Sequence, residues 1–286
     1  MASSATLRLR PHAAFDVLRY LFLALMTVVT IVPFAYMLAV SFNSPQDSQH
    51  IPVYWIPPHP TLDNYRPFFQ AGLDSPLLRS LANSVFVATA STLAVLTVDA
   101  LAAYGFTRLR LPGTNVIFGI ILLSLMVPVQ VTLIPIFLLM RDLHFLNSYN
   151  ALIWPAAAGA FGVFLLRQFF QAIPVELEEA AAMDGANIVR IFWSVDLPMV
   201  KNALVTLAVL TWLASWNDFF WPLIALSSDD KFTAPVEITA LNFAPSQSVG
   251  PLMAAAALVA TPPLIFYVIF QRRIRAAVMT TGLAGR

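Results

Sequence analysis

The sequence predicts an all-α, polytopic membrane protein with six transmembrane helices and with both chain termini in the cytoplasm. Three observations lead to this fold class. Only 11% of the 286 residues are charged, against about 25% in an ordinary soluble domain. Six apolar runs reach the roughly 20 residues that an α-helix needs to cross the hydrocarbon core of a bilayer. Lysine and arginine residues concentrate on one side of the resulting topology.

The first apolar run begins at Tyr20 and ends at Val40, after an N-terminal cytoplasmic arm of residues 1–18. A secretory signal peptide also combines arginines with an apolar core, but that core is only roughly 7–15 residues long. Because this run is longer, we expect a helix that is retained in the membrane.

Five further apolar runs complete a transmembrane domain that is predicted to extend over residues 19–271, before a cytoplasmic tail of residues 272–286. They cover residues 81–106, 115–140, 151–170, 202–226 and 251–270. None of them shows the alternation of apolar and polar residues that marks the strands of a membrane β-barrel, so we expect helices. Prolines within the last four runs are compatible with this, because neighbouring helices satisfy the freed backbone groups.

The positive charges orient these helices. With the N-terminus in the cytoplasm, twelve of the sixteen lysine and arginine residues lie in segments that face the cytoplasm. The four that are predicted to face outside are Arg66, Arg79, Arg141 and Lys231. This asymmetry predicts that both termini and the polar segment of residues 171–198 are cytoplasmic.

The polar segment of residues 171–198 separates the fourth run from the fifth and predicts two short helices joined by a tight corner. Pro174 suits the first turn of a helix, because its missing N–H needs no partner there. Gly185 readily adopts the left-handed conformation that ends a helix, and Asn187 is suited to cap a second helix through Trp193. Pro198 predicts the next helix boundary.

The same segment resembles the EAA signature of the membrane subunits of ABC importers. It reads Glu179-Ala180-Ala181, three residues, Gly185, nine residues, then Val195-Asp196-Leu197-Pro198. The family pattern has isoleucine where this chain has Val195. The resemblance implies the type I ABC-importer permease fold, in which this segment is the coupling helix that docks in a cleft of a cytoplasmic ATPase. The residues that it assigns to ATPase coupling are Glu179, Ala180, Ala181, Asp184, Gly185, Leu197 and Pro198.

Weaker landmarks along nearly the whole chain are similar to the carbohydrate-uptake branch of that family, and to its maltose-type permease subunit. They include Leu62–Tyr65, Asn83-Ser84, Arg167–Phe170 and Trp216-Asn217-Asp218. The resemblance implies a multi-pass protein of the bacterial inner membrane that imports a sugar or a related polyol. The implied partners are a second homologous permease subunit, an ATPase dimer and an extracytoplasmic solute-binding protein.

The sequence carries no recognisable catalytic or metal-binding motif. A phosphate-binding loop needs the pattern G-x-x-x-x-G-K-[ST], and neither Lys201 nor Lys231 lies in one. The chain has no cysteine, and its four histidines are scattered without ligand spacing. We therefore expect a transport subunit rather than an enzyme, with no metal and no cofactor of its own. A partner ATPase is expected to bind ATP and Mg²⁺.

Three polar residues within the apolar runs are candidates for a substrate pathway: Asp99, Asn217 and Asp218. Asp99 lies roughly 13 Å along its helix from the inner end, where a charged carboxylate costs roughly 2.5–3.5 kcal/mol. Its role is either in a pathway or gate or in a structural hydrogen bond to a neighbouring helix. Asn217 and Asp218, with Trp216 and Trp221 beside them, suit a sugar, although their depth favours an aromatic belt at the membrane interface.

The predicted function is that of the permease subunit of an ATP-driven, binding-protein-dependent importer, which couples ATP hydrolysis in a partner chain to alternating access. The alternative is a stand-alone secondary transporter or channel that uses Asp99 as an ion or proton site. The EAA-like spacing favours the importer, whereas an isolated intramembrane carboxylate favours the alternative.

Overall fold

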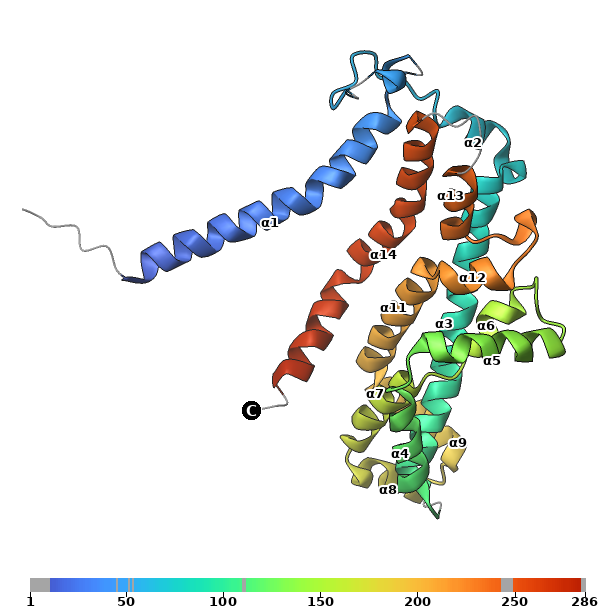
Figure 1. Cartoon of the computed structure of the whole chain (residues 1–286). Coiled ribbons are helices and arrows are strands. Elements are labelled where there is room, and N and C mark those ends of the chain that lie inside the picture. The colour runs from blue at the N-terminus through green and yellow to red at the C-terminus, as the bar shows by residue number, and fades with distance from the viewer. Residues whose placement is uncertain are drawn as a thin grey trace, which may run out of the picture. The chain divides into compact units, whose positions relative to one another are not determined.

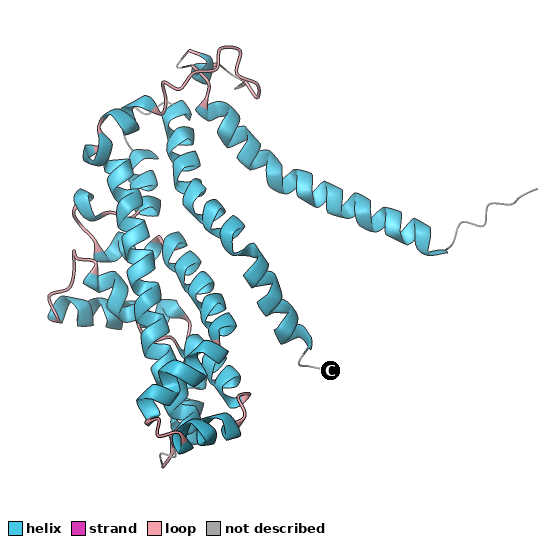
Figure 2. Ribbon diagram, turned by 180° about the vertical axis from the view of Figure 1, so that it is seen from behind, coloured by secondary structure: helices cyan, strands magenta, loops and turns pink. Residues whose placement is uncertain are grey.

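The computed structural model describes residues 11–44, 46–50, 52, 54–109, 112–242 and 249–283. Every element in these ranges is a helix, and no strand occurs among them (Figures 1 and 2), so the predicted all-α class is confirmed. The chain divides into two compact units, which are considered separately below: residues 1–67 with 244–258, and residues 68–243 with 259–286. Most of the predicted N-terminal arm and the end of the predicted tail lie outside the described residues.

In the first unit, the helix α1 (Pro11–Ser41) contains the first predicted apolar run and is longer than that run. Its stretch Phe15–Ser41 exposes apolar side chains on all sides, from Phe15 to Leu38. A helix that is apolar all round is typical of a membrane span, where lipid or other helices cover it.

Asn64 fastens the loop that follows α1 back onto the end of that helix. Its side-chain amide donates hydrogen bonds to the carbonyl oxygens of Ser41 at 2.9 Å and Asn43 at 2.8 Å. The Tyr65 hydroxyl lies 2.7 Å from the Ser41 hydroxyl. Gly250 allows this arrangement, because a Cβ there would lie only 2.7 Å from the Asn64 amide nitrogen. These contacts give a physical reason for the landmark Leu62–Tyr65.

The second unit is built on the long helix α3 (Pro76–Arg108), which contains the second predicted run. The helices that pack most extensively against it (Figure 1) are α6 (Asn150–Ala156), α7 (Ala160–Gln171), α11 (Lys201–Asn217) and α13 (Ala234–Asn242). The buried face of α3 is rich in small residues: Ser80, Ser84, Ala88, Ser91, Thr92, Ala100 and Ala103. Small side chains let helix backbones approach closely, which is the usual way that helices associate in membranes.

The third and fourth predicted runs are not single helices. The third forms α4 (Thr114–Ser124) and α5 (Val129–Asp142), which meet at 103°. Pro128 precedes α5 and has no N–H to donate, so the helical ladder cannot continue through it. The fourth run forms α6 and α7, bent by 43° beyond Pro155. Each of these two predicted runs is therefore divided into two helices beside one of its prolines.

The fifth run is also broken, because α11 ends at Asn217 and the chain resumes as α12 (Phe220–Ala225). Three helices are long and apolar enough to span a membrane alone, namely Phe15–Ser41, Pro76–Arg108 and Val249–Gln271. Within the described residues, the number of candidate membrane spans rises to six if each of three bent pairs of helices counts as one span. Two of these pairs are α4 with α5 and α6 with α7, and the third is Ile188–Met199 with Lys201–Asn217, which meet at 76°.

The helix α14 (Val249–Leu283) belongs to both units and runs without interruption through Pro262 and Pro263. Its Phe266 ring stacks on Trp212 at 4.2 Å between centroids, and Trp216 stacks on Trp212 at 5.1 Å. Trp216 is buried in this cluster. It is therefore a packing residue of the bundle and not a member of an interfacial aromatic belt. The remaining short elements are η1 (Asp47–Gln49), α2 (Arg66–Gln70), η2 (Gly72–Asp74) and η4 (Asp229–Lys231).

The segment that precedes and forms α13 is held on α3 by Asn83 and Ser84. The Asn83 amide donates to the carbonyl oxygens of Asp230 and Phe232, each at 3.0 Å, and the Ser84 hydroxyl accepts from the backbone N–H of Ala234 at 2.8 Å. This arrangement buries Glu237 on α13, outside the candidate membrane spans. Burial and, to a smaller extent, the charge of Asp229 raise the pKa of Glu237 above its ordinary value of 4.5.

This raised pKa predicts a pH dependence of stability. Because the folded state holds the Glu237 proton more tightly than the unfolded state, the contribution of Glu237 to stability is complete below pH 4.5 and is lost as the pH rises through the folded pKa. We expect Glu237→Gln to remove this decrease, as measured by thermal unfolding of the purified protein in detergent from pH 4.5 to 8. The control is Asp142→Asn at an exposed carboxylate, and an unchanged pH profile in Glu237→Gln would contradict the prediction.

Candidate functional site: the coupling segment and its anchor

The polar segment after α7 folds as two short helices around a tight corner, as predicted. The helix α8 (Val175–Met183) ends at Gly185, whose φ is +84°. The backbone N–H of Gly185 bonds the Ala182 carbonyl oxygen, and that of Ala186 bonds the Ala181 carbonyl oxygen, each at 3.0 Å. This is a left-handed helix ending that favours glycine. The Asn187 side chain then accepts from the backbone N–H of Arg190 at 2.9 Å and caps α9 (Ile188–Ile191).

The boundaries of this segment differ from the predicted ones at both prolines. Pro174 immediately precedes α8 instead of lying in its first turn. Pro198 lies inside the last short helix α10 (Leu197–Met199), and the chain bends after Met199. Between α9 and α10 the chain forms a wider π-helical turn, η3 (Phe192–Asp196). Because the Pro198 ring crowds the carbonyl four residues earlier, an ordinary α-helical ladder cannot pass through it, and the wider turn absorbs the misfit.

Arg108, the last residue of α3, anchors this segment to the helix bundle. Its guanidinium donates hydrogen bonds to the carbonyl oxygens of Phe170 at 3.0 Å and Ile173 at 2.9 Å. It also forms an ion pair with Glu178 in the first turn of α8, with an N–O separation of 2.5 Å. Both side chains are largely buried, with 12% and 15% of their surface exposed. One cation therefore joins the end of α3, the end of α7 and the start of α8.

A second carboxylate lies at the same place. Asp196 in η3 is fully buried. It interacts electrostatically with both Glu178 and Arg108. The rings of Tyr104, Phe170 and Phe192 lie in the hydrophobic cluster to which this end of α3 belongs. The Asp196 carboxylate therefore lies near a like charge at Glu178 and an opposite charge at Arg108, and the Arg108 guanidinium offsets part of the repulsion between the two carboxylates.

The residues assigned to ATPase coupling lie mostly on the surface of this anchored segment. Glu179, Ala180, Asp184, Gly185 and Pro198 are exposed, and Ala181 and Leu197 are partly buried. Large apolar side chains are exposed beside them: Met183 at 89%, Val189 at 60% and Trp193 at 58%. An apolar patch flanked by polar residues is typical of a protein–protein interface.

Sequence reasoning missed the anchor. In the sequence, Glu178 is one of several acidic residues after Pro174, and Arg108 is a basic residue just beyond the second apolar run. The available signal was an arginine just beyond the end of an apolar run, whose charge needs a partner when it is buried. That partner is 70 positions away in the sequence, so spacing does not identify it.

Asp99 joins α3 to the break between α6 and α7. Its carboxylate accepts a hydrogen bond from the backbone N–H of Gly159 at 3.0 Å, at the start of α7. The side chain is fully buried and packs against Gly162. A carboxylate in this position satisfies a free N–H and complements the positive end of the helix dipole. The geometry thus favours the structural role for Asp99.

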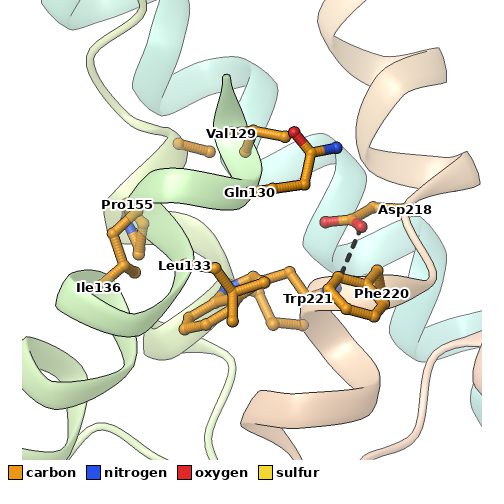
Figure 3. Close-up of a pocket in the computed structure, with 10 residues that line it drawn as sticks. Val129, Gln130, Leu133, Ile136, Pro155, Asp218, Phe220 and Trp221 are labelled. Atoms are coloured by element: carbon orange, nitrogen blue, oxygen red, sulfur yellow. Dashed lines mark hydrogen bonds between the residues drawn. The ribbon is translucent and has the colours of Figure 1, made fainter. Parts of the chain in front are cut away.

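Asn217 and Asp218 lie at the break between α11 and α12 but point to different surroundings. The Asn217 side chain is exposed and donates to the carbonyl oxygen of Leu213 on its own helix at 2.8 Å. Asp218 lines two adjoining hollows of about 510 and 300 Å³ within the second unit. Figure 3 shows its carboxylate facing the larger hollow, with Gln130 on the opposite side and Trp221 nearby. Of the three predicted pathway residues, Asp218 is the one that lines these hollows.

Long apolar helices with a polar, surface-exposed segment anchored to them define a multi-pass membrane protein. Comparison with known proteins agrees with this class. Residues 100–279 match the family described as the binding-protein-dependent transport system inner membrane component. The chain belongs to that family, and it is a multi-pass permease subunit of an ABC transporter in the inner membrane, a transport component and not an enzyme.

Several curated relatives align with almost the whole chain. The permease protein UgpE of the sn-glycerol-3-phosphate transport system of Yersinia pestis is 35% identical, over 88% of this chain and 93% of its own length. The permease protein LacG of the lactose transport system of Rhizobium radiobacter is 34% identical, over 90% and 93%. The permease protein AraQ of the arabinooligosaccharides transport system of Halalkalibacterium halodurans is 30% identical, over 92% and 94%.

Solved structures show the same fold. A chain of a bacterial ABC transporter involved in the import of the acidic polysaccharide alginate superimposes with a TM-score of 0.83, at 25% identity, over 94% of this chain and 99% of that one. A chain from the alginate transporter in complex with an alginate pentasaccharide-bound periplasmic protein gives a TM-score of 0.64 at 17% identity, and this second likeness concerns the fold alone.

The ion pair at Arg108 predicts that substitution of Arg108 lowers stability much more than substitution of Arg141. Arg108→Gln leaves a buried Glu178 carboxylate without its cation, which costs roughly 3–5 kcal/mol for a buried pair. Arg141→Gln removes an exposed ion pair with Asp142, worth at most about 1 kcal/mol. We expect thermal unfolding of the purified protein in detergent to show a clearly lower Tm for Arg108→Gln only. Equal Tm values for the two variants would show that Arg108 does not anchor the segment.

The contact between Asp99 and α7 predicts that Gly162 does not tolerate a side chain. A Cβ at Gly162 would overlap the Asp99 carboxylate and lie 3.0 Å from Leu207, so α7 has to move away from α3. Overpacking of this kind costs roughly 1–3 kcal/mol. The control is Gly119→Ala on α4, where the new Cβ has no atom within 4 Å. We expect a lower Tm for Gly162→Ala and an unchanged or higher one for the control.

Proposed function

We propose that this chain is one of two homologous permease subunits of an ATP-driven, binding-protein-dependent importer for a sugar or a related polyol. The observation that carries this proposal is the anchored coupling segment, which presents Glu179, Ala180 and Gly185 on its surface while Arg108 and Glu178 fix it to the bundle. Relatives named for the transport of lactose and of arabinooligosaccharides support the substrate class.

The proposed mechanism is alternating access driven by a partner ATPase dimer, which binds ATP and Mg²⁺. Closure of that dimer displaces α8, and the displacement passes through the Arg108–Glu178 ion pair to α3 and through Ile173 to α7. Because the anchor is buried and the surrounding packing is dense, the segment moves as a rigid lever instead of bending. The bundle then opens outward to accept substrate from an extracytoplasmic solute-binding protein.

The proposed topology has six membrane spans, with both termini and residues 171–198 in the cytoplasm. It counts the broken helices α4 with α5, α6 with α7 and α11 with α12 as one span each. The lysine and arginine distribution supports this orientation. The structural position of Asp99, together with membership of the permease family, favours the importer over a stand-alone transporter that uses Asp99 as an ion site.

Gly185 provides a test of the lever. At a φ of +84° a β-branched residue is strained, whereas asparagine tolerates this conformation comparatively well. We expect Gly185→Val to abolish ATP-dependent uptake of radiolabelled sugar by cells that carry the complete transporter, while insertion into the membrane remains normal. Gly185→Asn is the matched control and should retain most of the uptake. Normal uptake by Gly185→Val would contradict the lever mechanism.

A further inference from the structure

The larger hollow beside Asp218 is formed at the places where the predicted membrane helices break. Its lining comes from α5, α6 and the start of α12, and the smaller hollow adds residues of α3 and α11. Leu152, Ala156 and Asp218 line both hollows, so the two adjoin at this carboxylate. A volume of about 510 Å³ falls within the range of roughly 300–1,000 Å³ that is usual for sites of small molecules.

The larger hollow is lined by the polar side chains of Asp218 and Gln130. Figure 3 shows the Asp218 carboxylate and the Gln130 amide pointing into the same space. One Asp218 oxygen lies 3.4 Å from the backbone N–H of Trp221, which donates to it at the start of α12. This contact, together with a hydrogen bond from the backbone of Phe220, holds the carboxylate in place at the start of α12.

Aromatic and aliphatic side chains form the other walls. The Trp221 indole N–H donates to the carbonyl oxygen of Ala151 at 2.9 Å, which fixes the orientation of its ring. Phe220 is more than half exposed, and Leu133 also lines the hollow. Lysine, arginine and histidine do not occur among the residues that line the two hollows.

We propose that this hollow is a substrate subsite within this permease chain and that it selects neutral polyhydroxylated molecules over anionic ones. This proposal rests on the proposed function as a sugar or polyol importer. Hydroxyl groups of the substrate donate hydrogen bonds to the Asp218 carboxylate, and they donate to and accept from the Gln130 amide. The C–H faces of a sugar ring pack on the aromatic rings of Trp221 and Phe220. A phosphate or carboxylate group meets a like charge there and finds no cation in the lining.

The chain offers a direct test because it contains no cysteine, so a single introduced thiol reports on one position. Leu133→Cys places a thiol in the hollow, and Leu143→Cys, at an exposed position beyond the end of α5, is the control. The complete transporter is reconstituted in vesicles with each variant. Labelling by a methanethiosulfonate reagent is followed with and without glucose, lactose, maltotriose or glycerol, and with glucuronate or glycerol 3-phosphate as anionic probes.

We expect a neutral probe that the transporter takes up to slow labelling of Leu133→Cys at least several-fold, and to leave Leu143→Cys unchanged. We expect the anionic probes to protect neither thiol. If a neutral probe is taken up but Leu133→Cys is not protected, or does not react at all, the subsite proposal is wrong while the proposed function stands. If the anionic probes protect Leu133→Cys as well as the neutral probe does, the proposed selectivity for neutral molecules is wrong. If no neutral probe is taken up, the sugar importer proposal fails and the subsite proposal fails with it.

A second measurement tests the role of the Asp218 carboxylate by itself. In the Leu133→Cys background, a cationic reagent should react faster than an anionic one, and Asp218→Asn should equalise the two rates. The same substitution keeps an acceptor for the Trp221 N–H, so the start of α12 is preserved. We expect Asp218→Asn to weaken the apparent affinity for the transported neutral probe about tenfold, the effect of losing a hydrogen bond to a charged group. Unchanged affinity and unchanged labelling rates would overturn the role of Asp218.

Discussion

The ion pair between Arg108 and Glu178 is the interaction on which the organisation of the second unit depends. Arg108 ends the long helix α3 and also bonds the carbonyl oxygens that close α7. A surface loop held only by exposed contacts would fold and unfold locally, and it would transmit little force. A buried, charge-assisted attachment resists such opening, because separating the partners leaves uncompensated charges in a medium of low polarity. The short helices of the coupling segment are therefore part of the bundle.

The breaks in the apolar runs create helix ends whose backbone groups need partners. A straight helix satisfies its own backbone and presents only side chains to its neighbours, whereas a broken one exposes helix ends. In this chain the ends are used in two ways. The start of α7 is satisfied by Asp99 and becomes part of the packing. The start of α12 is satisfied by Asp218, whose carboxylate also borders a hollow. Two intramembrane carboxylates of the same chemistry thus have different surroundings.

The coupling segment shows how far local reasoning reaches. The corner at Gly185 and the cap at Asn187 follow from backbone preferences that act within a few residues, and both occur in the structure. A helix boundary also occurs within two residues of Pro198, because α10 begins at Leu197 and the chain bends after Met199, but the π-helical turn before it was not predicted. The cost of that wider turn depends on how Phe192 and Asp196 are buried, which the local sequence does not reveal.

The sequence by itself determined that the chain is a helical membrane protein, where its apolar runs lie and where the coupling segment turns. These properties depend on composition, on periodicity and on preferences of neighbouring residues. Only the tertiary structure decided that Arg108 meets Glu178, that Asp99 belongs to the packing, and that Asp218 borders a hollow. The physical reason is that a buried charge takes whichever partner the packing brings near, and that partner is 60 or 70 residues away for Asp99 and Arg108.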